Sequence, residues 1–268
     1  MTMHIRSAIR DFCDARLSTR AKLAVRALKA AWRPGPLDSP PVLERSVPGS
    51  RVLVIAPHPD DEAIGCGGTL LKYSRQGAVV WCAYLSDGSH CRSLARLDRA
   101  SARAVRLGEA SEAGRLLGIA RQLFHDDEHA QVRADRCTRD WLHGLFADFQ
   151  PDVVYLPTFL DRHREHLLTN QIVASAVPGS VQDVLCRAYE VWSLLDPNVY
   201  VDVTEEMPLK LQAIAQYRSG TATVEYVRCV EGLNAYRSMV ARAGRGYAEG
   251  FYTASLRAYL KVFAEAAR

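Results

Sequence analysis

The sequence has no long apolar run and no internal repeat. No stretch approaches the roughly 18 uninterrupted apolar residues of a membrane-spanning helix, so no segment is predicted to cross a bilayer. Apolar residues make up 48% of the chain and charged residues 24%, a balance that is typical of globular proteins and excludes general disorder. With 268 residues, the chain can form one main core with a short extension.

The cysteines lack any pattern of pairing. The chain has seven, an odd number, none of them in a Cys-x-x-Cys pair, and several lie in apolar runs such as residues 81–84. This pattern argues against a disulfide framework and against a zinc site built from cysteines. We therefore expect free thiols in a reducing compartment, which indicates the cytoplasm.

The net charge of +4 is concentrated at one end of the chain. Residues 1–33 carry +6, which leaves about −2 for the remainder, and we expect them to form a basic helical leader. The leader lacks the continuous apolar segment of a secretory signal. Weak peripheral contact with an anionic membrane is one interpretation, but a solvated helix beside the domain is favoured. The slightly acidic remainder argues against nucleic-acid binding, and no pattern indicates an oligomeric state.

Residues 34–50 are predicted to form a linker, because five prolines and two glycines there prevent a regular helix or a central strand. The domain proper then covers residues 51–268. In it, short apolar runs typical of buried strands alternate with helical segments, which predicts an α/β fold: a mostly parallel sheet with helices on both faces. The expected strands are 51–56, 78–85, 152–156, 185–192 and 199–203. The expected helices are 61–75, 94–118, one that ends near 176, 209–217, 228–243 and 253–266.

Two charged clusters follow predicted strands about a hundred residues apart. His58 and Asp61 are three residues apart, so one helical turn can direct an imidazole and a carboxylate towards one point, and Asp60 remains beside them. In the second cluster His163 and His166 have the same spacing. Both clusters fall at the carboxyl ends of strands, where parallel sheets bind their ligands. Two histidines and one carboxylate match catalytic zinc sites, and they suit ferrous iron as well.

Each of these motifs also has a plainer interpretation. Asp60 and Asp61 alone could cap the N-terminus of a helix, but the second cluster favours a metal site. The glycines of residues 65–68 are similar to a dinucleotide-binding turn, but the charged segment occupies the phosphate position, so close packing of helix on sheet is favoured. The run at 125–129 contains two histidines and three acidic residues, and a solvated loop is the favoured interpretation.

These residues resemble the PIG-L/LmbE family of zinc-dependent N-acetylglucosaminyl deacetylases, which share a Rossmann-like α/β fold. The family's His-Pro-Asp-Asp-Glu motif stands at residues 58–62, and its His-Pro-Asp-His motif stands at 163–166 with arginine and glutamate between the histidines. Residues 86–88 resemble a turn of the family. The chain departs from the pattern at Gly220, where the family usually has glutamine, and at Asp161, where some members have tyrosine. The resemblance spans roughly residues 50–255 and excludes the leader.

The resemblance implies a role for each residue of the two clusters. His58, Asp61 and His166 would be the metal ligands, Asp60 the general base, and His163 the group that stabilises the tetrahedral intermediate or protonates the leaving amine. Four other residues are further candidates, for orienting a ligand or contacting the substrate or its surroundings: Glu165, Asp87, Asp127 and Arg106.

We therefore expect a hydrolase that removes the N-acetyl group from an N-acetylglucosamine-type amino sugar in a glycoconjugate or sugar precursor. Zinc is the expected metal, with ferrous iron or another divalent transition metal as alternatives. One rival is an amidase that acts on another sugar-linked amide, such as a thiol conjugate. The other rival is a carbohydrate-binding relative that keeps the metal but has no activity. The presence of Asp60 beside all three ligands favours the enzyme.

Overall fold

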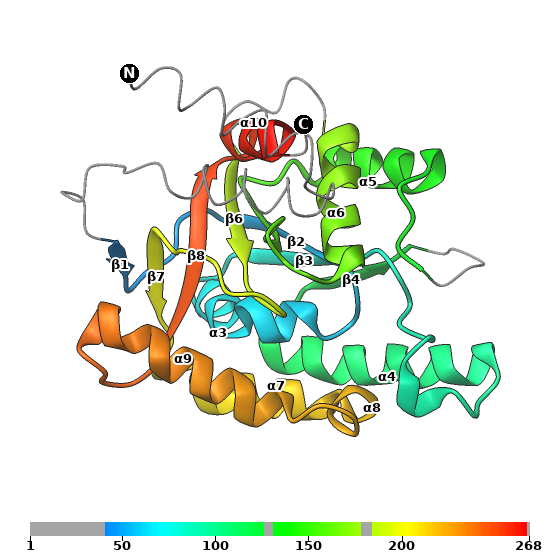
Figure 1. The fold of residues 1–268 in the computed structure, drawn as a ribbon, viewed down its shortest axis with the longest axis horizontal. Helices are drawn as coiled ribbons and strands as arrows, with labels where there is room; N and C mark the ends of the chain where they lie inside the picture. Colours follow the sequence, from blue (N-terminus) through cyan, green and yellow to red (C-terminus); the bar gives the residue numbers. More distant parts are fainter. Residues whose placement is uncertain (1–40, 126–130, 178–183, 267–268) are drawn as a thin grey trace, which may run out of the picture.

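The computed structural model describes residues 41–125, 131–177 and 184–266, whose strands form one sheet covered by helices (Figure 1). The strands are β1 (Val42–Glu44), β2 (Arg51–Ala56), β3 (Val79–Tyr84), β4 (Arg121–Phe124), β5 (Val153–Pro157), β6 (Leu185–Tyr189), β7 (Val199–Asp202) and β8 (Ala248–Ser255). The helices are α3 (Asp61–Arg75), α4 (Arg99–Leu117), α5 (Arg136–Phe149), α6 (Arg164–Ala176), α7 (Met207–Gln216), α8 (Arg218–Thr221), α9 (Tyr226–Arg242) and α10 (Leu256–Ala266).

The sheet is mostly parallel, as the sequence predicts. Its strand order is β1-β7-β8-β6-β5-β2-β3-β4, and only β8 runs antiparallel to its neighbours, β6 and β7. Strand β2 and helix α3 occupy the predicted ranges, residues 51–56 and 61–75. The α/β fold with helices on both faces is therefore confirmed.

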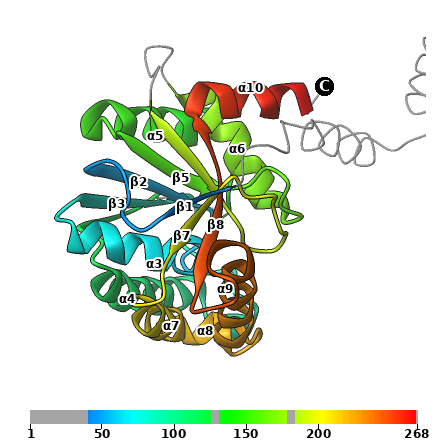
Figure 2. The ribbon, with the colours of Figure 1, turned by 90° about the vertical axis from the view of Figure 1, so that its left-hand side faces the viewer.

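Strand β2 shows how the sheet divides the core. Val52 and Val54 belong to a cluster that includes residues of α3, α4 and α7, whereas Leu53 and Ile55 belong to a cluster that includes residues of α5, α6 and α10. Figure 2 shows these two groups of helices on opposite faces of the sheet. All four side chains are fully buried, as expected for a parallel strand covered on both faces.

Strand β8 is an element that the sequence analysis does not predict. It occupies residues 248–255, where the sequence predicts no strand and where a helix is expected from residue 253. Glu249 and Gly250 interrupt its apolar residues, so it has no continuous apolar run. The local pattern therefore contains no signal for this strand, whose place is set by pairing with β6 and β7.

Strand β1 lies in the segment that the sequence predicts to be a linker. It pairs with β7 at the edge of the sheet, where prolines nearby are tolerated. Glu44 of β1 also forms an ion pair with Arg187 of β6, whose side chain is fully buried. A domain that began at residue 51 would leave the Arg187 charge buried without this carboxylate, so the sheet begins at Val42.

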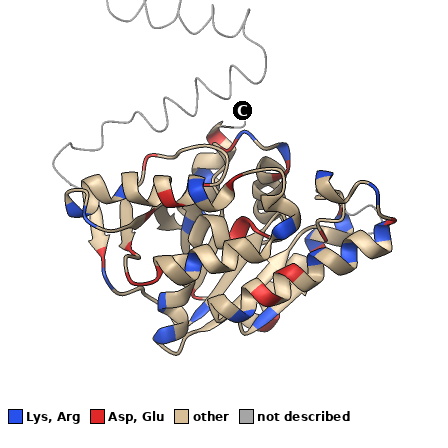
Figure 3. Cartoon of the chain, turned by 90° about the horizontal axis from the view of Figure 1, so that it is seen from below, with Lys and Arg blue, Asp and Glu red and all other residues tan. Residues whose placement is uncertain are grey.

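Lys and Arg residues are interspersed with Asp and Glu residues along the described helices that Figure 3 shows from below. Exposed pairs such as Glu112–Arg115 contribute little to stability. All six described cysteines are free. In the described part of the chain, no helix is long and apolar enough to cross a membrane. The leader predicted at residues 1–33 lies outside the described residues.

Glycines allow α3 to lie close to the sheet. A β-carbon on Gly65 would lie 2.2 Å from the Tyr189 ring, and one on Gly68 would lie 2.7 Å from Val203. The Tyr189 ring has little freedom to move, because it is fully buried and its hydroxyl donates a hydrogen bond to the Ile55 carbonyl at 3.0 Å. These contacts support the packing interpretation of residues 65–68.

Replacing Gly65 with alanine should therefore destabilise the protein by about 1–3 kcal/mol, the usual cost of overpacking a core. The matched control is Gly144→Ala in α5, where no atom lies within 4 Å of the added β-carbon. That change should raise the free energy of unfolding by about 0.5–1 kcal/mol, because alanine is the better helix former. Chemical denaturation measures both variants, and equal effects would contradict the packing role of Gly65.

Candidate active site

The predicted site residues lie at the carboxyl ends of two neighbouring strands. Strands β2 and β5 are parallel neighbours, with Val54 opposite Tyr155. Strand β2 leads through residues 57–60 into α3, and β5 leads through residues 158–163 into α6. Since β3 lies on the far side of β2, the strand order reverses between β2 and β5, and such a switch point is the usual ligand site of an open α/β sheet.

The predicted metal ligands converge at this switch point. Oδ2 of Asp61 lies 3.1 Å from Nδ1 of His58 and 3.4 Å from Nε2 of His166. Ligands of a tetrahedral zinc site with bonds of about 2.0–2.1 Å are separated by about 3.3 Å, so these donors fit such a site. His163 lies beside them, and the three histidines can each offer one ring nitrogen such that these three atoms lie within 4.8 Å of one another. A triad of three histidines is therefore the geometric alternative to the predicted ligand set.

Unpartnered nitrogens support a cation site. His166 is fully buried, yet its Nε2, which faces Asp61, has no partner of hydrogen-bond geometry among the described residues. The buried Nδ1 of His163 also has none. Leaving a buried polar atom unsatisfied costs about 1–3 kcal/mol, and imidazole and carboxylate donors together suit a divalent transition metal.

Two carboxylates contact the histidines from outside the cluster. Glu165 accepts a hydrogen bond from Nε2 of His58, which leaves Nδ1 directed at Asp61. Oδ2 of Asp161 lies 3.2 Å from Nδ1 of His166. Carboxylates in such positions fix the tautomer and the direction of histidines that bind metals. Glu165 thus contacts one of the predicted ligands, and the orienting role that the resemblance implies for it stays a prediction.

Sequence reasoning missed the position of Asp161. The residue stands out in the sequence only as a departure from the tyrosine of some relatives. Its place after a buried strand, two residues before His163 and five before His166, is a signal that could have identified it. Asp161 also accepts hydrogen bonds from the backbone N–H groups of His163 and Trp192, at 2.9 and 3.0 Å, so it ties three segments of the site together.

Asp60 belongs to a separate network. Its carboxylate accepts a hydrogen bond from Arg106 at 3.0 Å, and Arg106 also contacts Glu109 and Ser219. The Asp60 carboxylate makes no capping hydrogen bond to α3, so the capping interpretation does not describe its contacts. Burial raises the pKa of Asp60 to about 6, and the positive charge of Arg106 opposes this rise. A carboxylate with such a pKa is ionised at neutral pH and can accept a proton.

The backbone of Asp60 is strained. Its φ of 126° lies in a region that residues with a β-carbon rarely adopt, and such strain is often found at functional sites. Two contacts hold this conformation: Asp60 N–H donates to Glu62 Oε2 at 3.1 Å, and Arg106 donates to the Pro59 carbonyl. Glu62 is itself fully buried and accepts a hydrogen bond from the Tyr217 hydroxyl.

The other predicted residues have different places. Asp87 is buried and accepts a hydrogen bond from the backbone N–H of Ser89 at 2.9 Å. Its Oδ2 lies 3.6 Å from the guanidinium of Arg99 and 3.5 Å from that of Arg103. Among the described residues, no ion pair joins Asp87 to the two histidine clusters. Arg106 contacts Asp60, as described above. Asp127 lies outside the described residues.

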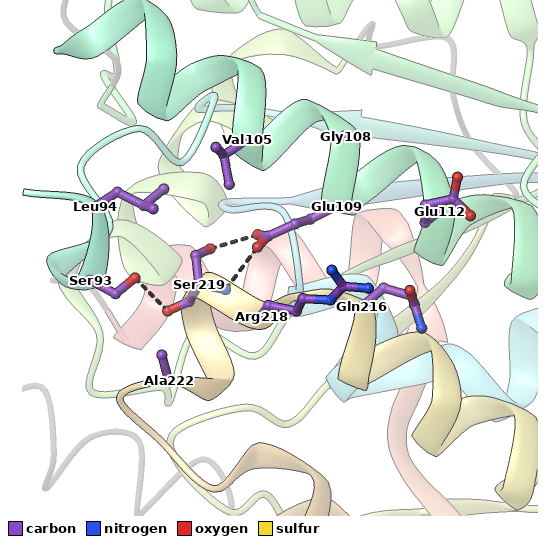
Figure 4. Close-up of a pocket in the computed structure, with 10 residues that line it drawn as sticks. All are labelled: Ser93, Leu94, Val105, Gly108, Glu109, Glu112, Gln216, Arg218, Ser219 and Ala222. Atoms are coloured by element: carbon purple, nitrogen blue, oxygen red, sulfur yellow. Dashed lines mark hydrogen bonds between the residues drawn. The ribbon is translucent and has the colours of Figure 1, made fainter. Parts of the chain in front are cut away.

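A pocket of about 500 Å³ lies between α4 and α8, next to the Asp60 network (Figure 4). Ser219 and Glu109 line it and hydrogen-bond to each other, and Ser93 donates to the Ser219 carbonyl at 2.7 Å. None of the predicted metal ligands lines this pocket. The candidate site is therefore defined by its converging side chains at the sheet edge.

Solved structures share this fold. N,N'-diacetylchitobiose deacetylase from Pyrococcus horikoshii, complexed with its inhibitor MPG, matches with a TM-score of 0.65 and 26% identity over 77% of this chain and 84% of that chain. The 4-carboxy-2-hydroxymuconate hydratase GalB from Pseudomonas putida matches with a TM-score of 0.64 and 22% identity over 75% of this chain and 95% of that chain. The second likeness concerns the fold alone. The chain thus has an LmbE-like α/β fold.

The sequence comparisons are more specific. Residues 53–177 match the family model described as PIG-L: GlcNAc-PI de-N-acetylase. Diacetylchitobiose deacetylase of Thermococcus kodakarensis is 26% identical over 185 residues, which cover 63% of this chain and 69% of that protein. The resemblance to the PIG-L/LmbE family of deacetylases is thereby confirmed, and the matched residues include both histidine clusters.

The contact between Asp161 and His166 predicts an effect on metal affinity. Asp161→Asn should lower the affinity for zinc about 10- to 100-fold, the usual effect of losing a carboxylate behind a metal-binding histidine. Asp152→Asn, the same change at the opposite end of β5, should leave it unchanged, because the Asp152 carboxylate accepts hydrogen bonds from the backbone N–H groups of Ser50 and Arg51. Competition with a chromogenic chelator measures both affinities, and an unchanged value for Asp161→Asn would contradict this role.

Proposed function

We propose that this protein is a metal-dependent hydrolase that removes the N-acetyl group from an N-acetylglucosamine-type amino sugar, within a glycoconjugate or a sugar precursor of the cytoplasm. One observation carries the proposal: Asp61 converges with His58 and His166 while the adjacent Asp60 is held by Arg106. A metal-binding set and a proton acceptor therefore lie side by side. The matches to the PIG-L model and to diacetylchitobiose deacetylase support an acetylated amino sugar as the substrate.

Each residue has a defined part in this proposal. His58, Asp61 and His166 would hold the metal, with zinc as the first candidate and ferrous iron as an alternative. When bound, such a metal supplies Lewis-acid chemistry, which polarises an amide carbonyl and lowers the pKa of water. Asp60 accepts the proton of the attacking water, and Arg106 fixes the direction of its carboxylate.

His163 serves the leaving group. Its buried Nδ1 has no hydrogen-bond partner among the described residues, so no other side chain holds the ring through this nitrogen. Burial and the nearby His58 and His166 lower the pKa of His163, and a protonated ring in this place releases its proton readily. We infer that His163 stabilises the developing negative charge and protonates the departing amine.

Acetate release tests the proposed function. Purified protein should contain about one transition-metal ion per chain and should release acetate from N-acetylglucosamine or N,N'-diacetylchitobiose, and a strong chelator should abolish the release. Hydrolysis of a sugar-linked thiol conjugate without acetate release would instead show the rival amidase. Binding of acetylated sugars without any hydrolysis would show a carbohydrate-binding relative.

The adjacent aspartates give the sharpest mutational test, because Asp60→Asn and Asp61→Asn remove the same charge from different networks. Asp61→Asn should lower the metal content markedly, and added metal should restore part of the activity. Asp60→Asn should keep the metal but lower turnover about 10²- to 10⁴-fold, the range for a lost general base. Metal content and turnover are measured side by side, with His163→Ala as a third variant.

Three results would revise the assignments. If Asp60→Asn empties the site while Asp61→Asn keeps it full, the base and the ligand are reversed. If His163→Ala empties the site, the triad of three histidines holds the metal. If Asp60→Asn retains full turnover, another group accepts the proton.

A further inference from the structure

Trp192 is a large aromatic residue exposed beside the candidate site. It follows β6, the strand next to β5, with Tyr189 opposite Pro157 at the strand ends. The residue is 48% exposed to solvent. Single exposed apolar residues are common, so what distinguishes Trp192 is its place beside the residues of the candidate site.

The geometry ties Trp192 to the site residues. Its ring is stacked on that of His163, with centroids 6.5 Å apart and an angle of 22° between the planes. Its backbone N–H donates a hydrogen bond at 3.0 Å to Oδ2 of Asp161, the same carboxylate oxygen that lies beside His166. The position of the Trp192 backbone is therefore linked to the histidine cluster.

Tyr226 forms the second side of this aromatic corner. Its ring lies 5.9 Å from Trp192 and nearly perpendicular to it, at 71°. Gly220 allows Tyr226 to approach the site, because a β-carbon on Gly220 would lie 3.3 Å from the Tyr226 ring and 3.2 Å from Oδ2 of Asp60. The departure from the usual glutamine at Gly220 thus leaves room between Asp60 and the aromatic corner.

We propose that Trp192 and Tyr226 form a subsite for a second sugar ring, the pyranose linked to the acetamido sugar. This inference rests on the proposed deacetylation. A pyranose has an apolar face of C–H groups with hydroxyls at its edge, and a rigid indole offers a flat apolar surface with little loss of conformational entropy.

The solvent exposure of these side chains indicates which sugar ring of the substrate the aromatic corner of Trp192 and Tyr226 contacts. His166 is fully buried, His163 is partly buried, and Trp192 is half exposed, so the three residues lead from the interior outwards. The acetamido group must reach the buried ligands to react. The sugar that bears the acetamido group therefore lies over the histidines, and the sugar linked to it lies at Trp192.

Steady-state kinetics with N-acetylglucosamine and N,N'-diacetylchitobiose test this subsite. Trp192→Ala should raise KM for the disaccharide about tenfold, with kcat within about twofold, and should leave KM for the monosaccharide unchanged. Trp192→Phe should restore most of the disaccharide affinity, because it keeps an aromatic face. The metal content should stay constant, since the contact with Asp161 uses the backbone N–H.

The matched control is Tyr236→Ala, which removes an aromatic residue that is 58% exposed on α9. Tyr236 is ten residues along the helix from Tyr226, about 15 Å away, so neither substrate should be affected. If Trp192→Ala changes KM equally for both sugars, or for neither, the second-ring subsite is wrong.

The failure of the proposed function would give a different result. In that case wild-type protein releases acetate from neither sugar. Calorimetric titration of wild type and Trp192→Ala with the two sugars then still tests the subsite: tighter binding of the disaccharide that depends on Trp192 supports it, and equal binding of both sugars overturns it.

Discussion

The site is organised around the buried negative charge of Asp61. A carboxylate removed from water must be paired, because the cost of an uncompensated buried charge is several kcal/mol. His58 and His166 supply that compensation and hold the pKa of Asp61 well below its ordinary value, against the rise that burial alone would cause. A bound cation would meet the same requirement, and for this reason the arrangement suits a metal.

The pairing of opposite charges extends beyond Asp61. His58 and His166 each contact a further carboxylate, Glu165 and Asp161 respectively, so acidic and imidazole groups alternate along a chain of five side chains. These groups come from the segments after β2 and β5. Parallel pairing of the two strands brings the segments to one edge of the sheet, so the electrostatics of the site depend on strand order.

Asp60 is adjacent in sequence but belongs to a different electrostatic environment. The unusual φ at Asp60 marks the turn where the chain enters α3, and the two consecutive carboxylates have separate partners. Asp61 is paired with histidines, whereas Asp60 is paired with Arg106, which belongs to α4. One charged dipeptide can therefore supply both a metal ligand and a proton acceptor.

The sequence predicts those parts of the fold and site that depend on local patterns. The apolar run of β2 and the spacing of His58 with Asp61 and of His163 with His166 are local, and the structure contains the strand and brings the two clusters together. The aromatic corner at Trp192 depends instead on the relative placement of the segments after β6 and before α9. No local pattern records that placement, and the same holds for the edge strand β1.

Strand β8 shows why the long-range part escapes prediction. In the sequence, Glu249 interrupts the apolar residues of this segment. In the structure, its side chain is fully buried and forms an ion pair with Lys210 of α7 at 2.6 Å. The two residues are 39 positions apart, so the partner that makes a buried glutamate acceptable is not visible locally.

The same glutamate also affects the position of the candidate site. Its carboxylate accepts hydrogen bonds from the backbone N–H groups of Gly68 and Thr69, both at 2.8 Å, in the middle of α3. Lys210 balances its charge, so β8, α7 and α3 are held together by one buried polar group. Because Asp60 and Asp61 stand at the start of α3, a shift of this helix would move both carboxylates at once. The geometry of the candidate site therefore depends on a buried ion pair, Lys210–Glu249, that lies outside both histidine clusters.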